Sequence, residues 1–104
     1  MMQKDIKYTE VQHVINSLIL VLKKYASERM SYQINQLELV EEILHTEESV
    51  QEKNRILNTL MDRIYQGPGS LTEFYVFDED DEKRAEINKP IGELIFKLWD
   101  LVRN

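Results

Sequence analysis

The chain has 104 residues, of which 42% are hydrophobic and 31% are charged, and its net charge is −6. These values are typical of a single globular domain and exclude a disordered chain. Because 19 acidic residues outnumber 13 basic ones, phosphate backbones would repel the surface, which argues against direct binding of nucleic acid. The absence of cysteine excludes disulfides and thiolate metal sites.

The apolar segments of the chain are short. The longest uninterrupted run covers the five residues 18–22, whereas a helix needs about 20 apolar residues to cross a bilayer. The polar residues 1–5 do not lead into an apolar region of signal-peptide form. We therefore expect a cytoplasmic protein that does not bind membranes.

The first two predicted helices follow apolar residues at three- and four-residue spacing. The first covers residues 9–26 with Thr9 as its N-cap, and its wide apolar face predicts a helix that is covered on more than one side. A bend is expected at residues 27–31, because one continuous helix would be too long for a compact domain. The second helix covers residues 32–45, with Ser31 as its cap.

The third predicted helix covers residues 50–65. Ser49 and Glu52 precede it at the spacing of a capping box, in which a serine and a glutamate satisfy each other's backbone N–H groups. Gly67 is a natural left-handed stop, and Pro68 prevents the helix from continuing.

The last helix leaves two alternatives because of Pro90. Either Asn88 caps a short helix that holds Pro90 in its first turn, or one helix runs from about 81 to 103 and bends at Pro90. We favour the longer helix. The acidic residues 80–82 would then lie at its N-terminus, where negative charge is stabilising.

An aromatic segment separates the third helix from the fourth. Residues 71–77 include Phe74, Tyr75 and Phe77, which favour extended backbone. No second stretch of the chain is suited to pair with this segment, so we expect it to lie extended on the bundle or to form an edge strand. The predicted fold is one all-α domain covering residues 1–104, a small antiparallel four-helix bundle with one short extended aromatic segment.

The acidic run that follows this segment has partial features of a calcium loop. Asp78, Asp80 and Glu82 alternate as calcium ligands do. Lys83 stands where the loop requires its turn glycine, and Lys89 stands where it requires its closing glutamate. The pattern therefore favours a solvated run that caps a helix.

Other catalytic and metal-binding patterns are weak or absent. Glu41 and His45 are four residues apart and could share a metal, but a metal site needs three or four ligands. The sequence has no nucleophile elbow, no phosphate-binding loop and no zinc-protease motif. We therefore expect no enzyme activity, no metal and no cofactor, and we expect Trp99 to complete the core.

Acidic residues gather in two regions without Lys or Arg, residues 38–52 and 71–82. The second region also carries aromatic residues, and this combination suits a docking face for a basic protein partner. The expected partner-binding residues are Glu73, Phe74, Tyr75, Phe77, Asp78, Asp80 and Asp81. The alternatives are an ordinary solvated surface, or a structural or regulatory homodimer formed through the broad apolar faces of the first two helices.

The tail of the chain carries a short motif in which two glycines and a serine precede an apolar, an acidic and two aromatic residues. The matching residues are Gly67, Gly69, Ser70, Leu71, Glu73, Phe74, Tyr75 and Val76, with Leu98 and Trp99 later. This tail resembles that of small acidic bacterial proteins of uncharacterised function, although Pro68 and Pro90 depart from their pattern. Some of those proteins are similar to immunity proteins, which neutralise a toxin encoded beside them. The resemblance implies a protein that binds a basic toxin.

Overall fold

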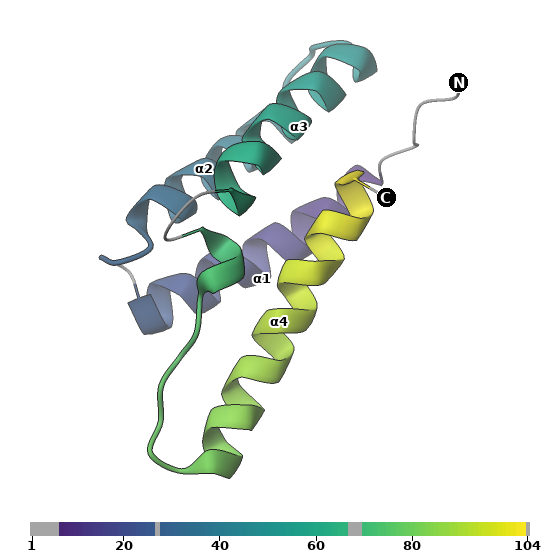
Figure 1. Ribbon diagram of the computed structural model, residues 1–104. Helices are drawn as coiled ribbons and strands as arrows, with labels where there is room; N and C mark the ends of the chain where they lie inside the picture. The colour runs from purple at the N-terminus through teal and green to yellow at the C-terminus, as the bar shows by residue number, and fades with distance from the viewer. Residues whose placement is uncertain (1–6, 27, 67–69, 104) are drawn as a thin grey trace.

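The structure, a computed structural model, describes residues 7–26, 28–66 and 70–103. It confirms the all-α class: in these described residues the four helices are α1 (Tyr8–Ala26), α2 (Ser31–Leu44), α3 (Val50–Tyr65) and α4 (Asp81–Arg103), with one 3-10 turn, η1 (Leu71–Glu73). α2 and α3 lie side by side and antiparallel, while α1 packs against both α2 and α4 (Figure 1). None of the described helices combines the length and apolar character that crossing a bilayer requires.

α1 is covered on two sides, as its wide apolar face predicts. Its buried residues include Leu18, Ile19 and Leu22, whereas Leu20 points outward and is 71% exposed. The helix already begins at Tyr8, so the expectation that Thr9 caps it is wrong. Thr9 lies inside the first turn, because the backbone carbonyl of Lys7 accepts the first helical hydrogen bond.

The starts of α2 and α3 test two further predicted caps. Met30, which is buried, occupies the N-cap position of α2, so the prediction that Ser31 is the cap is wrong by one residue. Ser49 is confirmed as the cap of α3, since its hydroxyl accepts a 3.2 Å bond from the backbone N–H of Glu52. The Glu52 carboxylate binds Arg55. The predicted stop at residues 67–68 lies outside the described residues.

α4 is one continuous helix with Pro90 inside it, so the alternative start at Asn88 is wrong. Asp80 precedes the helix and acts as its cap. Its Oδ1 atom accepts hydrogen bonds of 2.9 Å and 3.1 Å from the backbone N–H groups of Glu82 and Lys83. The acidic run therefore caps the helix, as the sequence predicts.

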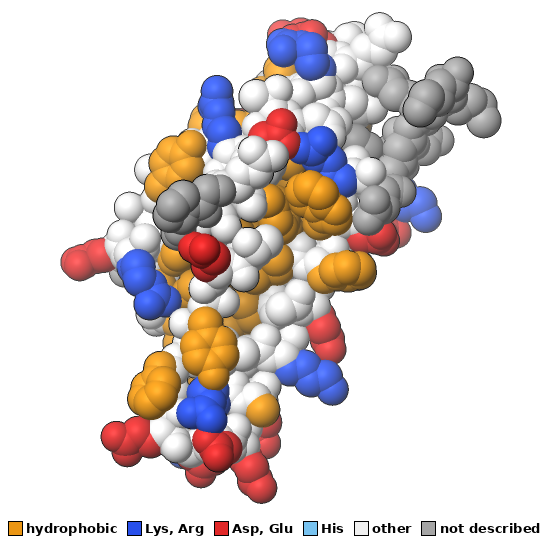
Figure 2. Space-filling view, in the orientation of Figure 1, with side chains coloured by type: hydrophobic (Ala, Val, Ile, Leu, Met, Phe, Trp, Pro, Cys, Tyr) orange, Lys and Arg blue, Asp and Glu red, His pale blue; other side chains and the backbone are white. Residues whose placement is uncertain are grey.

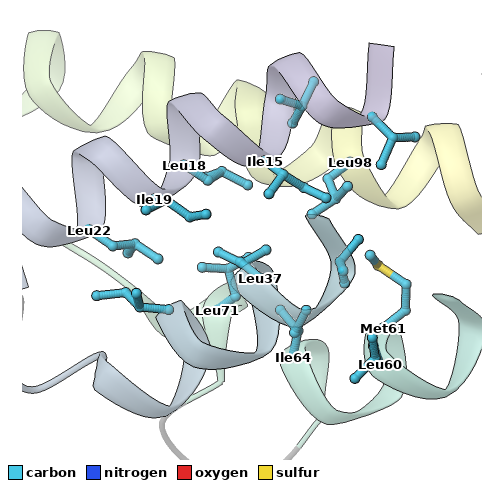
Figure 3. Close-up of a cluster of buried hydrophobic side chains, with 14 of the residues drawn as sticks. Ile15, Leu18, Ile19, Leu22, Leu37, Leu60, Met61, Ile64, Leu71 and Leu98 are labelled. Atoms are coloured by element: carbon cyan, nitrogen blue, oxygen red, sulfur yellow. The ribbon is translucent and has the colours of Figure 1, made fainter. Parts of the chain in front are cut away.

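The core lies between α1 and the two helices that pack on it, α2 and α4, and α3 and η1 add side chains to it. Figure 3 shows Leu18 and Leu22 of α1 on one side of the core, with Leu37 of α2 and Ile64 of α3 on the other. Leu71 extends from η1 into the same cluster and is fully buried. This leucine anchors the start of the segment that leads to α4.

The first half of α4 contributes little to this core. Residues 81–90 are exposed or partly buried, and the buried residues of the helix are Ile91, Leu98 and Val102. In Figure 1 the lower end of α4 extends away from α2 and α3, and the segment after η1 descends beside it. This segment and the first half of α4 together form the surface considered below.

Candidate functional site

We call residues 74–78 the strap, because they connect η1 to α4 without forming a helix or a strand. The strap begins extended, with φ −66° and ψ 130° at Phe74. The extended segment therefore starts at Phe74, three residues later than the predicted start at residue 71. Leu71–Glu73 form a 3-10 turn instead, which is closed by a 3.1 Å bond from the Phe74 N–H to the Leu71 carbonyl.

Asn88 of α4 holds the middle of the strap. Its Oδ1 accepts a 2.8 Å bond from the Val76 N–H, and its Nδ2 donates to the Val76 carbonyl at 2.7 Å. The same Nδ2 donates to the carbonyl of Arg84. The sequence predicts a role for Asn88 only as a helix cap, and no local spacing points to this contact.

Two arginines hold the rest of the strap backbone. Arg29, between α1 and α2, donates to the Tyr75 carbonyl at 3.3 Å, and its guanidinium lies 5.6 Å from the ring centre of Phe74. Arg84 donates to the Asp78 carbonyl at 3.1 Å, and its guanidinium lies 5.9 Å from the ring centre of Phe77. The acidic region that lacks basic residues in sequence thus has two of them beside it in space.

The aromatic residues of the strap differ in exposure. Phe74 is only 9% exposed and belongs to the hydrophobic core, so little of its side chain reaches the surface that was expected to contact a partner. Burial is the outcome expected for a large apolar side chain next to the anchored Leu71. Tyr75 is 50% exposed and Phe77 is 73% exposed. These two aromatic side chains remain available to a partner.

The expected acidic residues also divide into two groups. Asp78 accepts from the Asp80 N–H, Asp80 caps α4, and Asp81 pairs with Arg84, so these three carboxylates shape the turn. Glu73 is exposed on η1, away from this turn in sequence. Figure 2 shows acidic side chains gathered at the end of the molecule where α4 begins.

Glu79 and Glu82 are exposed in the same turn, residues 78–82, which we call the acidic turn. Neither makes a side-chain hydrogen bond or ion pair with any residue in the described parts of the chain. Their charges are therefore the ones in this turn that are left for a partner.

A hollow of about 510 Å³ lies between the strap, Tyr65 of α3 and the part of α4 from Asn88 to Trp99. We call it the aromatic groove. Five aromatic side chains line it: Tyr65, Phe74, Tyr75, Phe96 and Trp99. Asn88, Ile91, Gly92 and Ile95 complete its α4 wall. Hydrophobic side chains are visible between the strap and α4 in Figure 2.

Tyr65 and Trp99 form the end of the groove nearest the C-terminus. Their rings meet edge to face with centres 5.0 Å apart. The Tyr65 hydroxyl donates to the Ile95 carbonyl, and burial raises the pKa of Tyr65 well above its ordinary value, an effect partly opposed by the backbone of Trp99. Trp99 is only partly buried, so it lines the groove and does not fill the core.

This groove was not predicted, although the sequence of α4 carries a signal for it. Ile91, Leu98 and Val102 form the core stripe of α4. Phe96 and Trp99 lie off that stripe, and a helix with large apolar residues on a second face has a second surface to cover.

The other candidate sites are weaker. The described residues contain no group of three or more potential metal ligands among His, Cys, Asp and Glu. His45 lies against Gln12, with 3.2 Å between their Nε2 atoms. In the other acidic region, residues 38–52, Glu38 lies 4.0 Å from Lys23 and Glu52 pairs with Arg55. That region therefore has basic neighbours, and the hollow beside Glu38 has no aromatic side chain among its described lining residues.

Comparisons with protein-family models, with curated proteins and with solved structures found no match to this chain. The strap, the acidic turn and the aromatic groove therefore carry the functional argument.

Proposed function

We propose that this chain is a non-enzymatic binding protein whose strap and acidic turn contact a basic protein partner. The observation that carries the proposal is the exposure of Tyr75 and Phe77 on a backbone that three other side chains already hold. Exposed aromatic side chains bury large areas on binding, and a backbone that is ordered beforehand loses little entropy.

The charge of the acidic turn supports a basic partner. Glu79 and Glu82 are exposed and unpaired within the described parts of the chain, and the net charge of the whole protein is −6. Such a field attracts a positive partner and speeds its association, and salt screens the effect. Asp78, Asp80 and Asp81 contribute mainly by fixing the shape of the turn.

A toxin-neutralising role is the most specific form of this proposal. It is supported by the resemblance of residues 67–99 to immunity-like proteins together with the acidic surface. A cytoplasmic location accords with such a role, since an immunity protein of this kind protects the cell that makes the toxin.

Charge reversal tests the proposal. The probe is a helix-forming peptide of leucine and lysine that contains no tryptophan. We expect the double variant Glu79→Lys and Glu82→Lys to associate with it about tenfold more slowly at low salt, with the difference fading as salt rises. The matched control, Glu47→Lys and Glu48→Lys, makes the same change of charge outside the site. Equal rates for the two double variants would contradict the proposal.

The aromatic contact is tested separately with two side chains of similar exposure. Phe77 is 73% exposed and Leu20 is 71% exposed, but Leu20 lies on α1. We expect Phe77→Ala to weaken binding of the same peptide by more than about 1 kcal/mol. Leu20→Ala serves as the control and should leave binding unchanged. An equal effect of both changes would show that Phe77 makes no specific contact with the peptide.

A structural or regulatory homodimer is the second candidate. It is favoured by the exposure of Leu20 on α1 and of Tyr32 and Leu39 on α2, at 71%, 51% and 41%. Light scattering across a range of concentrations tests the second candidate, because a protein that stays monomeric at every concentration cannot function as a homodimer.

A further inference from the structure

We infer that the aromatic groove receives the apolar face of a short amphipathic helix, with its basic residues toward the acidic turn. This inference rests on the proposed function, because it specifies which element of the basic partner binds. The groove follows α4 from Asn88 to Trp99, a distance of about three helical turns. A partner helix lying along it could place apolar side chains from successive turns in the same groove.

The strap is poorly suited to the main alternative, which is pairing with a strand of the partner. Strand addition requires free backbone N–H and C=O groups along an edge. Asn88 already occupies both polar backbone groups of Val76, while the carbonyls of Tyr75 and Asp78 accept from arginines. A partner strand would have to displace these bonds, whereas an apolar helix face needs none of them.

Gly92 opens the wall of the groove. A Cβ atom added at this position would meet no heavy atom within 4 Å, so space lies directly over the α4 backbone. Glycine in a helix interior lowers helix stability relative to alanine, and Pro90 lies only two residues away. The protein therefore has its least favourable helix residues where the groove is open, and the glycine lets a partner approach the backbone closely.

The rim of the groove fits a partner that covers it. Phe96 is 68% exposed and Tyr75 is 50% exposed, and both line the hollow. Large aromatic side chains left this exposed are the residues that supply binding energy when a partner excludes water from them.

Charge sets the direction of the bound helix. The acidic turn, with Glu79 and Glu82, follows the strap and precedes Asn88 along the chain, at one end of the groove. At the other end, Arg103 lies 5.1 Å from the Trp99 ring centre and pairs with Asp62. Charge complementarity therefore places lysines or arginines of the partner helix nearest the acidic turn.

The first test compares two probe peptides of identical leucine and lysine composition. One has leucines at helical three- and four-residue spacing, and the other alternates leucine with lysine. Trp99 is the only tryptophan of the chain and lines the groove, so its emission reports occupation. We expect the helical probe to shift this emission and to bind at least about tenfold more tightly than the alternating one. Equal binding and equal shifts would overturn the inference.

The second test fills the groove. We expect Gly92→Leu to weaken binding of the helical probe at least about tenfold without lowering the melting temperature, because leucine favours helix and has room at this position. Phe96→Ala should also weaken binding, whereas Leu20→Ala, which removes a side chain of similar exposure from α1, should not. Wild-type affinity in Gly92→Leu and Phe96→Ala would overturn the inference.

The two proposals fail in different ways. If charge reversal at Glu79 and Glu82 slows association but the groove variants bind normally, the groove inference fails and the proposed function stands. If the groove variants weaken binding but charge reversal at Glu79 and Glu82 has no effect, the proposal that the partner is basic is wrong. A shift of Trp99 emission with protein concentration alone, without a probe, would show that a second copy occupies the groove and would overturn the inference.

Discussion

The side-chain amide of Asn88 forms two hydrogen bonds with the backbone of Val76, although the two residues are 12 positions apart. One amide atom accepts and the other donates, so Asn88 satisfies Val76 as a neighbouring strand would. This pair fixes the strap against α4. Because the strap and α4 form facing walls of the aromatic groove, the pair also sets the groove's shape.

Removal of the Asn88 amide should therefore destabilise the protein and loosen the strap. Asn88→Ala leaves the partly buried N–H and C=O of Val76 without their partners, which we expect to cost about 1–3 kcal/mol in free energy of unfolding. Asn58→Ala is the matched control, since its side chain makes one bond to the Asn54 carbonyl within α3. Urea denaturation of both variants measures the difference. Equal losses of stability would show that the two bonds to the strap contribute no more than the single bond of Asn58.

The Asp80 cap gives a second prediction. Asp80→Ala removes the acceptor for the first backbone N–H groups of α4, and we expect a loss of about 1 kcal/mol in free energy of unfolding. Asp80→Asn keeps an acceptor and should recover most of that loss, apart from a dipole contribution of about 0.3 kcal/mol, the low end of the range, because Asp80 is exposed. Thermal and urea unfolding are suitable measurements. A stability of Asp80→Asn as low as that of Asp80→Ala would contradict a capping role.

The burial of Tyr65 leads to a prediction about the stability of the protein at alkaline pH. Burial raises the pKa of Tyr65 in the folded protein above its unfolded value of about 10. The stability that depends on the neutral phenol is therefore fully present below pH of about 10 and is lost as pH rises above it, because the unfolded chain releases the proton more readily.

Comparison with phenylalanine isolates this effect. Tyr65→Phe removes the bond to the Ile95 carbonyl and should cost about 0.5–1.5 kcal/mol at neutral pH. Between neutral pH and about one unit above the ordinary tyrosine pKa of about 10, the wild type should lose more stability than the variant. Parallel declines of the two urea midpoints with pH would exclude an ionisable Tyr65 as a source of alkaline unfolding.

The helices were predictable because local features determine them. Residues 50–65 were predicted with the bounds that the structure gives to α3, since Ser49 provides a capping hydroxyl and the apolar spacing is regular. The start of α2 was predicted less well, because no strong cap or glycine marks it and Met30 takes the N-cap position through burial. The long helix through Pro90 was also predicted, from the acidic residues that cap it.

The contacts of the strap could not be predicted from the same local features. Arg29 reaches Tyr75 across 46 positions, and no periodicity or composition of a single sequence relates two such residues. Exposure of individual aromatics was equally hidden: Phe74 and Phe77 have the same side chain in one short segment, yet only Phe77 is solvated. That difference depends on which of them follows the Leu71 anchor into the core.

Pro90 and Gly92 also determine how α4 responds to heat. Proline removes a helical hydrogen bond and glycine increases the entropy gained on melting, while no residue from 81 to 90 is buried. Segments with few buried contacts open at a lower free energy than the core around Leu98. On warming, the first half of α4 and the strap that it holds would thus open while Leu18, Leu37 and Ile64 still hold the bundle closed, so the upper temperature limit of the proposed binding would be set by half of one helix.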